Sequence, residues 1–195
     1  MKIIEPSVEL IDDIDGQQIL RKLELCGKVS RKSKLGDAEN FVRSIIKRGH
    51  ESVLEHVSLT FHIICDRAIM AELTRHRLAS FTVESTRYIK YDELKFISPF
   101  KDDLVGDTFL LMDMGTAEKA YLGWLQSGAT PEQARAVLPL CLATELYMTA
   151  NLREIRHILK LRTDKAAHLQ MRVVAGKILD ILREKLPVIV EDITP

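Results

Sequence analysis

The most informative part of this sequence is the run Arg75-His76-Arg77-Leu78-Ala79-Ser80-Phe81-Thr82-Val83-Glu84-Ser85-Thr86-Arg87-Tyr88. Three arginines, a histidine and four hydroxyl side chains crowd into it, and no apolar face of helical or strand period continues through it. Guanidinium groups are planar donor forks suited to phosphate and carboxylate. A solvated basic loop is the plainer alternative, but such a loop needs neither the interspersed hydroxyls nor the glutamate. The run therefore predicts a binding site for an anionic ligand.

Composition places limits on the rest of the chain. Its 195 residues suffice for one compact domain, which we expect to span residues 1–195. Lys+Arg and Asp+Glu both number 28, and this balance argues against a general nucleic-acid or membrane binder. The three scattered cysteines form no Cys-x-x-Cys pair, and neither a signal-peptide pattern nor an apolar run of bilayer length is present. We expect a cytoplasmic protein.

Hydrophobic patterning predicts alternating strands and helices in the first half of the chain. Asp37 is placed to cap a helix whose apolar residues recur at helical spacing, and Gly49 is placed to end it. A period of two predicts a half-buried strand over Val57–Ile64. The other expected elements are a strand over Lys2–Ile11 interrupted at Pro6, helices over Gln17–Cys26 and Arg67–Thr74, a solvated loop over Lys28–Lys34, and strands over Tyr88–Tyr91 and Lys95–Ile97.

The second half is predicted to be helical throughout. A long helix is expected over Asp107–Gln126, with an apolar stripe suited to a core or a subunit interface. Thr130-Pro131-Glu132-Gln133 is a capping box with proline at the first helical position, and Pro139 should kink the helix that it opens. Further helices are expected from Asn151 and over Lys165–Leu186, the latter capped by Asp164 and closed by Pro187.

Two groups of polar residues leave alternatives open. His50-Glu51-Ser52-Val53-Leu54-Glu55-His56 could suggest a metal site, but its spacing is not His-Glu-x-x-His, and we expect no metal. Later in the chain, Arg135 lies in an apolar stretch, where its aliphatic stem could cover hydrophobic surface. A polar helix face is the plain interpretation of a second cluster made of Asn151, Arg153, His157 and Arg162.

These motifs together resemble one family, the flavin-dependent thymidylate synthases or thymidylate synthase complementing proteins. The signature of that family reads Arg-His-Arg-x-x-Ser-(Tyr/Phe)-x-x-x-Ser-x-Arg-Tyr, and residues 75–88 meet every fixed position. Gly49 to His56 resembles a second landmark. Arg-x-x-Leu-Pro from Arg135, Asn-x-Arg from Asn151 and Leu161-Arg162 resemble later ones. The resemblance runs in order from about Gly49 to Arg172.

The resemblance implies methylation of dUMP to dTMP with methylenetetrahydrofolate, in which FAD reduced by NADPH supplies the hydride. It implies that FAD contacts Ser52, Arg75, His76, Arg77, Val83, Asn151, Arg153 and His157, with His50 near the flavin face. It implies that dUMP contacts Glu72, Arg75, Arg87, Arg135 and Arg162, with Val83, Glu84, Ser85 and Thr86 lining its phosphate. Arg162 is the implied catalytic residue, which activates the uracil.

The implied fold is α+β, that of the thymidylate synthase complementing proteins, with an antiparallel sheet flanked by long helices. The implied assembly is a homotetramer whose active sites are shared between subunits. The chain departs from the family at Thr82-Val83, where polar residues are usual, so any contact of Val83 must come from its backbone. The alternative function is a nucleotide- or nucleic-acid-binding regulator without chemistry, which the zero net charge and the interspersed carboxylates disfavour.

Overall fold

The computed structural model describes residues 1–100 and 104–195, and the chain divides into two compact units. Unit 1 comprises Met1–Ser7, Ile63–Arg75 and Thr82–Leu146. Unit 2 comprises Val8–His62, His76–Phe81 and Tyr147–Pro195. The expectation of a single domain over residues 1–195 stays a prediction.

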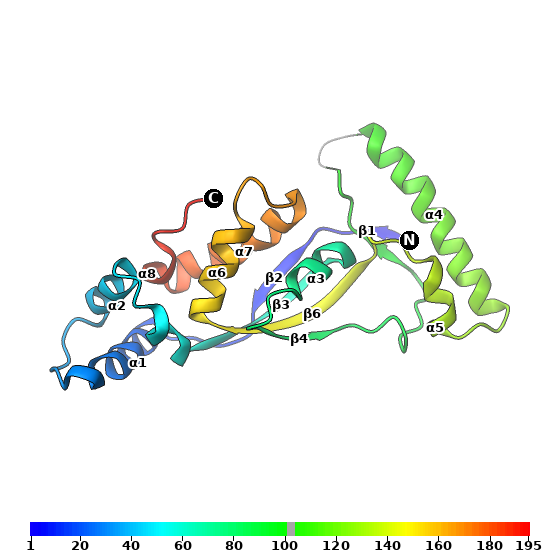
Figure 1. The fold of residues 1–195 in the computed structure, drawn as a ribbon. Helices are drawn as coiled ribbons and strands as arrows, with labels where there is room; N and C mark the ends of the chain where they lie inside the picture. Colours follow the sequence, from blue (N-terminus) through cyan, green and yellow to red (C-terminus); the bar gives the residue numbers. More distant parts are fainter. Residues whose placement is uncertain (101–103) are drawn as a thin grey trace. The chain divides into compact units, whose positions relative to one another are not determined.

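One sheet has four antiparallel strands in the order β2-β3-β6-β4 (Figure 1). Its strands are β2 (Ser7–Leu10), β3 (Ser58–Asp66), β6 (Ala143–Asn151) and β4 (Ser80–Val83). Along β3 and β6 buried side chains alternate with more exposed ones, which is the period of two that a sheet with one covered face produces. Sheet and helices together confirm the predicted α+β class.

Unit 2 is built mainly from helices, and acidic side chains cap the first two of them. Asp15 accepts hydrogen bonds from the backbone N–H groups of Gln17 and Gln18, and Asp37 accepts one from Asn40. After the second helix the chain turns at Gly49, whose φ of 70° suits glycine. The elements are α1 (Gly16–Lys28), η1 (Val29–Arg31), α2 (Ala38–Lys47), η2 (Glu51–His56), α6 (Leu152–Arg162), α7 (Leu169–Lys185) and α8 (Pro187–Val190).

Unit 1 has its own hydrophobic core. Strands β1 (Lys2–Ile3) and β5 (Lys95–Phe96) pair in parallel, with Ile3 opposite Phe96. The buried cluster beside them consists of Leu94, Phe96, Met114, Tyr121, Ala134 and Leu142. The helical elements are α3 (Arg67–Leu73), α4 (Leu104–Gln126), α5 (Pro131–Ala134) and η3 (Arg135–Val137).

The prediction that the second half is helical throughout is wrong at β6. The capping box at Thr130 forms as expected, but α5 ends after one turn, and Pro139 lies beyond it rather than kinking it. The strand that follows uses Leu146, Met148 and Ala150 as its buried positions. Leucine, methionine and alanine favour helices, so intrinsic propensity points the wrong way and the alternating burial decides the structure.

Three smaller expectations are also corrected. Residues 88–91 form a turn and coil rather than a strand, whereas Ser80–Val83, inside the signature, forms β4. Helix α7 begins at Leu169 with His168 as its cap, because Asp164 instead accepts a hydrogen bond from Ala166 in a separate turn. The loop after α1 contains the short helix η1.

Candidate functional site

A buried polar cluster surrounds His76 in unit 2. His76 follows α3 and is one of the few polar residues that are buried. Its Nε2 accepts a hydrogen bond from Nε of Arg162 at 3.0 Å. Its Nδ1 lies 3.4 Å from Oε1 of Glu154, and the ring of His157 meets it edge-on with the centroids 6.0 Å apart. Three predicted site residues, His76, His157 and Arg162, are thus in one cluster.

Helix α6 positions the partners of His76. Asn151 caps this helix by accepting a hydrogen bond from the N–H of Glu154, at 2.9 Å. Glu154, His157 and Arg162 then follow on the same helix, with Ile155, Ile158 and Leu159 packed in the core. The apolar residues fix the rotation of the helix, and this rotation directs its polar residues towards His76.

His76 is neutral at physiological pH. Burial, followed by the positive charge of Arg162 and the neighbouring His157, lowers the pKa of its imidazole to about 4. Burial raises the pKa of Glu154, and His157 opposes that shift. The cluster is therefore a partly desolvated site. Its side chains are held by hydrogen bonds to a neutral imidazole rather than by an ion pair between His76 and Glu154.

A second feature of unit 2 is a cavity of about 600 Å³ beside η2 and the loop after α1. Three cationic side chains line it, those of Lys28, Arg48 and Arg153, against the single carboxylate of Glu51. Two other predicted cofactor residues, His50 and Ser52, also line this cavity. Glu24 pairs with Lys28 at 2.6 Å and Glu55 pairs with Arg153 at 2.5 Å, so two of these cations are held by carboxylates beside the cavity. Cationic side chains around a space of this size suit an anionic ligand larger than a single phosphate.

Three predicted cofactor residues of unit 2 are already engaged or exposed. Arg153 donates a hydrogen bond to Oε1 of Glu55 at 2.5 Å, so a carboxylate holds its guanidinium at the rim of the cavity. Arg77 is exposed in the turn after His76. The side-chain oxygen Oδ1 of Asn151 accepts the hydrogen bond of the helix cap. This leaves the side-chain NH2 group of Asn151 as the donor for any ligand.

The remaining predicted residues belong to unit 1. Glu72 is the last but one residue of α3, whereas Arg75 lies beyond the helix end, in a turn closed by its N–H donating to the carbonyl oxygen of Glu72. Arg135 is exposed at the junction of α5 and η3. Arg87 is exposed and pairs with Glu132 at 3.1 Å.

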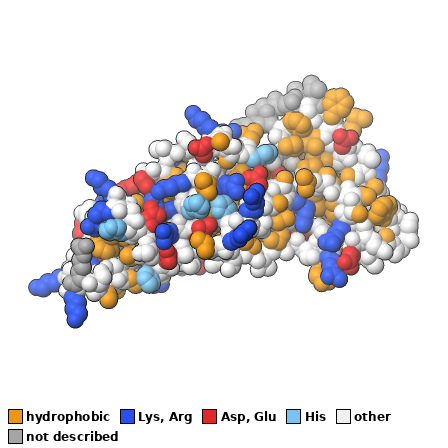
Figure 2. Space-filling view, in the orientation of Figure 1, with side chains coloured by type: hydrophobic (Ala, Val, Ile, Leu, Met, Phe, Trp, Pro, Cys, Tyr) orange, Lys and Arg blue, Asp and Glu red, His pale blue; other side chains and the backbone are white. Residues whose placement is uncertain are grey.

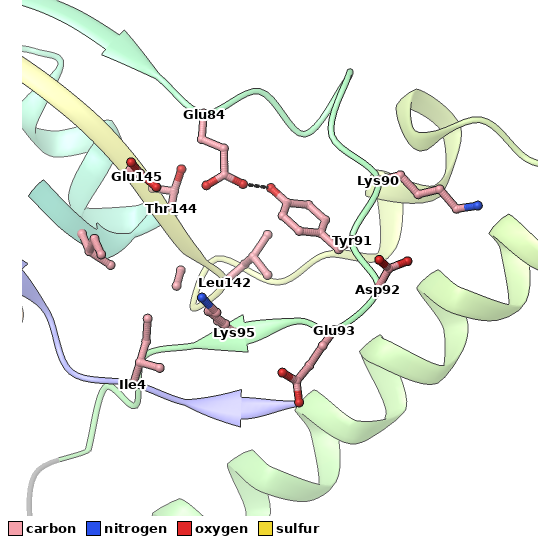
Figure 3. Close-up of a pocket in the computed structure, with 12 residues that line it drawn as sticks. Ile4, Glu84, Lys90, Tyr91, Asp92, Glu93, Lys95, Leu142, Thr144 and Glu145 are labelled. Carbon is pink, nitrogen blue, oxygen red and sulfur yellow. Dashed lines mark hydrogen bonds between the residues drawn. The ribbon is translucent and has the colours of Figure 1, made fainter.

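The segment from Val83 to Arg87 is a closed loop. The N–H of Glu84 donates to the carbonyl oxygen of Glu145 on β6 at 2.8 Å, and Ser85 Oγ accepts from the N–H of Arg87 at 3.3 Å. The phenol of Tyr91 donates a short hydrogen bond to Oε1 of Glu84, drawn in Figure 3. The backbone N–H of Tyr91 donates to the hydroxyl of Tyr121, so the segment is tied to β6 at Glu84 and to the core of unit 1 at Tyr91.

Tyr91 and Glu84 also line a cavity of about 340 Å³ within unit 1 (Figure 3). Ile4, Ile64 and Leu142 supply its apolar lining, and acidic and basic side chains surround these residues. Of the predicted site residues, only Glu84, a predicted dUMP contact, belongs to this lining. The cavity therefore does not mark a site for the predicted cofactor residues.

Several residues of these sites were missed by the sequence reasoning. They are Lys28, Arg48, Glu55, Tyr91 and Glu154. For Glu154 a signal existed, because it lies one helical turn before Ile158 and so on the apolar face of α6, where a carboxylate needs a partner. Across the described residues, no group of three or more His, Cys, Asp or Glu side chains is placed to hold a metal ion.

Comparison with known proteins gives the context of this geometry. A curated flavin-dependent thymidylate synthase from Pyrococcus horikoshii is 36% identical over 166 residues, which cover 80% of this chain and 68% of that protein. One from Thermococcus kodakarensis is 37% identical over 166 residues, covering 80% of this chain and 65% of that protein. The chain thus spans about two thirds of the length of these archaeal relatives.

A solved structure gives the same result for the fold. The crystal structure of the UMP/dUMP methylase PolB from Streptomyces cacaoi, bound with 5-Br dUMP, superimposes with a TM-score of 0.86 at 25% identity, covering 98% of this chain and 96% of that one. The family model described as "Thymidylate synthase complementing protein" matches residues 9–188. The predicted fold and the predicted enzyme class are confirmed, and the chain belongs to the thymidylate synthase complementing protein family.

Proposed function

We propose that this protein methylates dUMP to dTMP, with methylenetetrahydrofolate as the one-carbon donor, FAD as the bound cofactor and NADPH as the reductant. The observation that carries the proposal is the contact between His76 of the signature and Arg162 of the last landmark, which are 86 residues apart in sequence. Relatives named flavin-dependent thymidylate synthases and a structural neighbour named a UMP/dUMP methylase support the same activity.

The residues of unit 2 fit a flavin nucleotide. The cavity beside η2 offers Lys28, Arg48 and Arg153 for the negative charge of a dinucleotide pyrophosphate, and Ser52 as a hydrogen-bonding group. We propose that His76, Arg77, Asn151, His157 and His50, together with Arg75 and the backbone of Val83, complete the cofactor site. When bound, FAD would supply the hydride chemistry that no side chain of the protein can supply.

For dUMP the proposal assigns the phosphate to the signature loop and the base to Arg162. Arg75, Arg87 and Arg135 are exposed guanidinium groups in unit 1, and the backbone of the tied loop from Val83 to Thr86 is suited to lining a phosphate. Glu72 is a further proposed dUMP contact. Arg162 would donate to the N3–C4=O edge of uracil and stabilise the negative charge that develops there when C5 reacts.

The neutral state of His76 matters for this role of Arg162. A protonated imidazole would repel the guanidinium and could not accept its hydrogen bond, whereas the neutral ring accepts it at Nε2. The folded protein therefore keeps Arg162 held in one orientation before substrate arrives, and a preorganised donor of this kind needs little rearrangement during the reaction.

We also propose that the active protein is a homotetramer with shared sites. Helix α4 carries large exposed apolar side chains, among them Phe109 at 65% and Met112 at 67% exposure, together with Leu111 and Trp124. On the face shown in Figure 2, hydrophobic side chains gather over α4. Exposed apolar area of this extent is typical of a subunit interface.

The proposed location is the cytoplasm. The three cysteines Cys26, Cys65 and Cys141 carry reduced thiols and form no disulfide, which suits a reducing compartment. None of the described helices combines the length and the apolar composition that crossing a bilayer requires.

The direct experiment is a product assay on the purified full chain. Its absorption spectrum should show bound flavin, and incubation with dUMP, methylenetetrahydrofolate and NADPH should yield dTMP, identified by mass spectrometry. UMP should be tested in parallel, because the structural neighbour is described as a UMP/dUMP methylase. Bound and reducible FAD without methylation of dUMP would contradict the proposed activity. A chain that binds nucleotide but no flavin would favour the regulator alternative.

A further inference from the structure

Glu154 is a buried carboxyl group to which the proposed function gives no role. It lies in the first turn of α6, three residues after the cap Asn151, and its side chain is 6% exposed. A glutamate at this position of a helix often accepts a hydrogen bond from the backbone N–H of the cap residue. Here its Oε1 lies 3.4 Å from Nδ1 of His76 instead.

The hydrogen bond on the other side of the ring determines where the imidazole proton is. The Nε–H of Arg162 can donate but cannot accept, so Nε2 of His76 must be the unprotonated acceptor. A neutral imidazole carries one proton, and that proton must then lie on Nδ1. This nitrogen is the one that faces Glu154.

We propose that Glu154 is a positioning residue that holds the proton of His76 on Nδ1 and thereby orients Arg162 through Nε2. A side chain at residue 154 without an acceptor would let the proton move to Nε2, where the ring N–H would oppose the Nε–H of Arg162. The guanidinium would then lose this hydrogen bond, which holds its Nε in one direction. Ligand-orienting contacts of this kind fix the tautomer of histidines in metal sites in the same way.

The proposed role does not depend on the charge of Glu154. Burial raises the pKa of its carboxyl group, but a protonated carboxyl still has a carbonyl oxygen that accepts from Nδ1–H. The groups that face His76 are Glu154, His157 and Arg162, all on α6, and the pKa of His76 itself is lowered to about 4. An amide at position 154 should therefore preserve the arrangement, whereas an apolar side chain should abolish it.

The experiment compares Glu154→Gln and Glu154→Leu in the full chain, with Asp180→Asn as the matched control. Asp180 is an exposed acid on α7 that contacts Arg183 and no residue of the site. The first measurement is long-range ¹H–¹⁵N NMR of histidine-labelled protein, which reports the protonated ring nitrogen of His76 without flavin or substrate. We expect Nδ1–H in the wild type, in Glu154→Gln and in Asp180→Asn, and a mixture or Nε2–H in Glu154→Leu.

The second measurement is the rate of thymidylate formation, and its interpretation rests on the proposed function. Glu154→Leu should lower kcat roughly ten- to hundredfold, as loss of an orienting outer-shell partner does. KM for dUMP should change little, because the orientation of Arg162 matters most in the transition state. Glu154→Gln should restore most of kcat, which a purely structural role of the carboxylate would not predict.

The outcomes separate this inference from the proposed function. Wild-type His76 protonated on Nε2, or a Glu154→Leu variant with unchanged tautomer and kcat, would overturn the role of Glu154. The role of Glu154 would also be overturned if Glu154→Gln showed the same tautomer and the same kcat as Glu154→Leu. If Glu154→Leu does not fold, the wild type and Glu154→Gln still decide the tautomer. A wild type that forms no dTMP contradicts the proposed function and leaves the tautomer result intact.

Discussion

Replacing Arg156 with methionine should destabilise the protein strongly, although Arg156 contacts none of the proposed ligands. Its side chain, 1% exposed, binds both oxygens of Asp192, at 2.7 and 2.8 Å, and Oε1 of Glu51 at 3.0 Å. Nη1 also donates to the carbonyl oxygen of Ile189. The guanidinium thus joins η2, α6 and the C-terminal segment of unit 2.

The magnitude follows from what the substitution leaves behind. Removing one partner of a buried pair typically costs about 3–5 kcal/mol. Asp192 is 41% exposed and can be hydrated, while Glu51 is 20% exposed and keeps Lys160 at 3.7 Å. The buried carbonyl of Ile189 loses a donor. We therefore expect the lower end, about 3 kcal/mol, or a fall in Tm of roughly 6–12 °C for a chain of this size.

Arg43→Met is the matched control. Arg43 also pairs with two carboxylates, Glu39 at 2.8 Å and Glu191 at 2.7 Å, but its side chain is 41% exposed. Exposed pairs contribute about 0–1 kcal/mol. Urea unfolding of both variants measures the difference in unfolding free energy. Equal loss in the two variants would refute the argument that burial of Arg156 makes its contacts matter. Because Glu51 begins η2, Arg156→Met should also weaken flavin binding at Ser52.

Three further predictions concern single groups. The pKa of His76 falls from 6.5 to about 4 on folding, so its contribution to stability should be complete above pH 6.5 and be lost as the pH falls towards 4; unfolding of His76→Gln at a series of pH values should lack this part of the dependence. Tyr91→Phe removes the hydrogen bond to Glu84 and should raise KM for dUMP up to about tenfold with unchanged flavin affinity; an unchanged KM would show that the tie does not order the loop. Burial raises the pKa of Cys65 to about 12 and also raises that of Cys141, so neither thiol should act as the nucleophile; Cys65→Ala and Cys141→Ala should still make dTMP, and loss of turnover in either folded variant would contradict this.

Local patterns predicted the elements whose signals are local. Asp37, Thr130 and Gly49 are caps and stops recognisable from a few neighbouring residues, and each acts as expected. Strand β6 is different, because its helix-favouring residues become a strand through pairing with β3 and β4, which no short window contains. The strand β4 within the signature was missed for the same reason.

In the site, too, some residues could be found from local motifs and others only from the folded structure. Motifs singled out His76 and Arg162, and in the structure Nε of Arg162 donates a hydrogen bond to Nε2 of His76. Glu154 and Arg156 lie in the same short helix, but their partners His76 and Asp192 are distant in sequence, so only the folded chain reveals which group each of the two contacts. Buried charged residues on an apolar helix face were the available sign that such partners must exist.

The most direct test of the proposed chemistry is the rate of dTMP formation by Arg162→Ala, measured beside Arg183→Ala, an exposed arginine of α7 outside the site. Loss of one preorganised donor is worth about 3–4 kcal/mol of barrier, so Arg162→Ala should form dTMP roughly two to three orders of magnitude more slowly than the wild type. Flavin binding and NADPH oxidation should persist, and Arg162→Lys should recover part of the rate. Methylation of dUMP by Arg162→Ala at the rate of Arg183→Ala would contradict the assignment of Arg162 as the residue that activates the uracil.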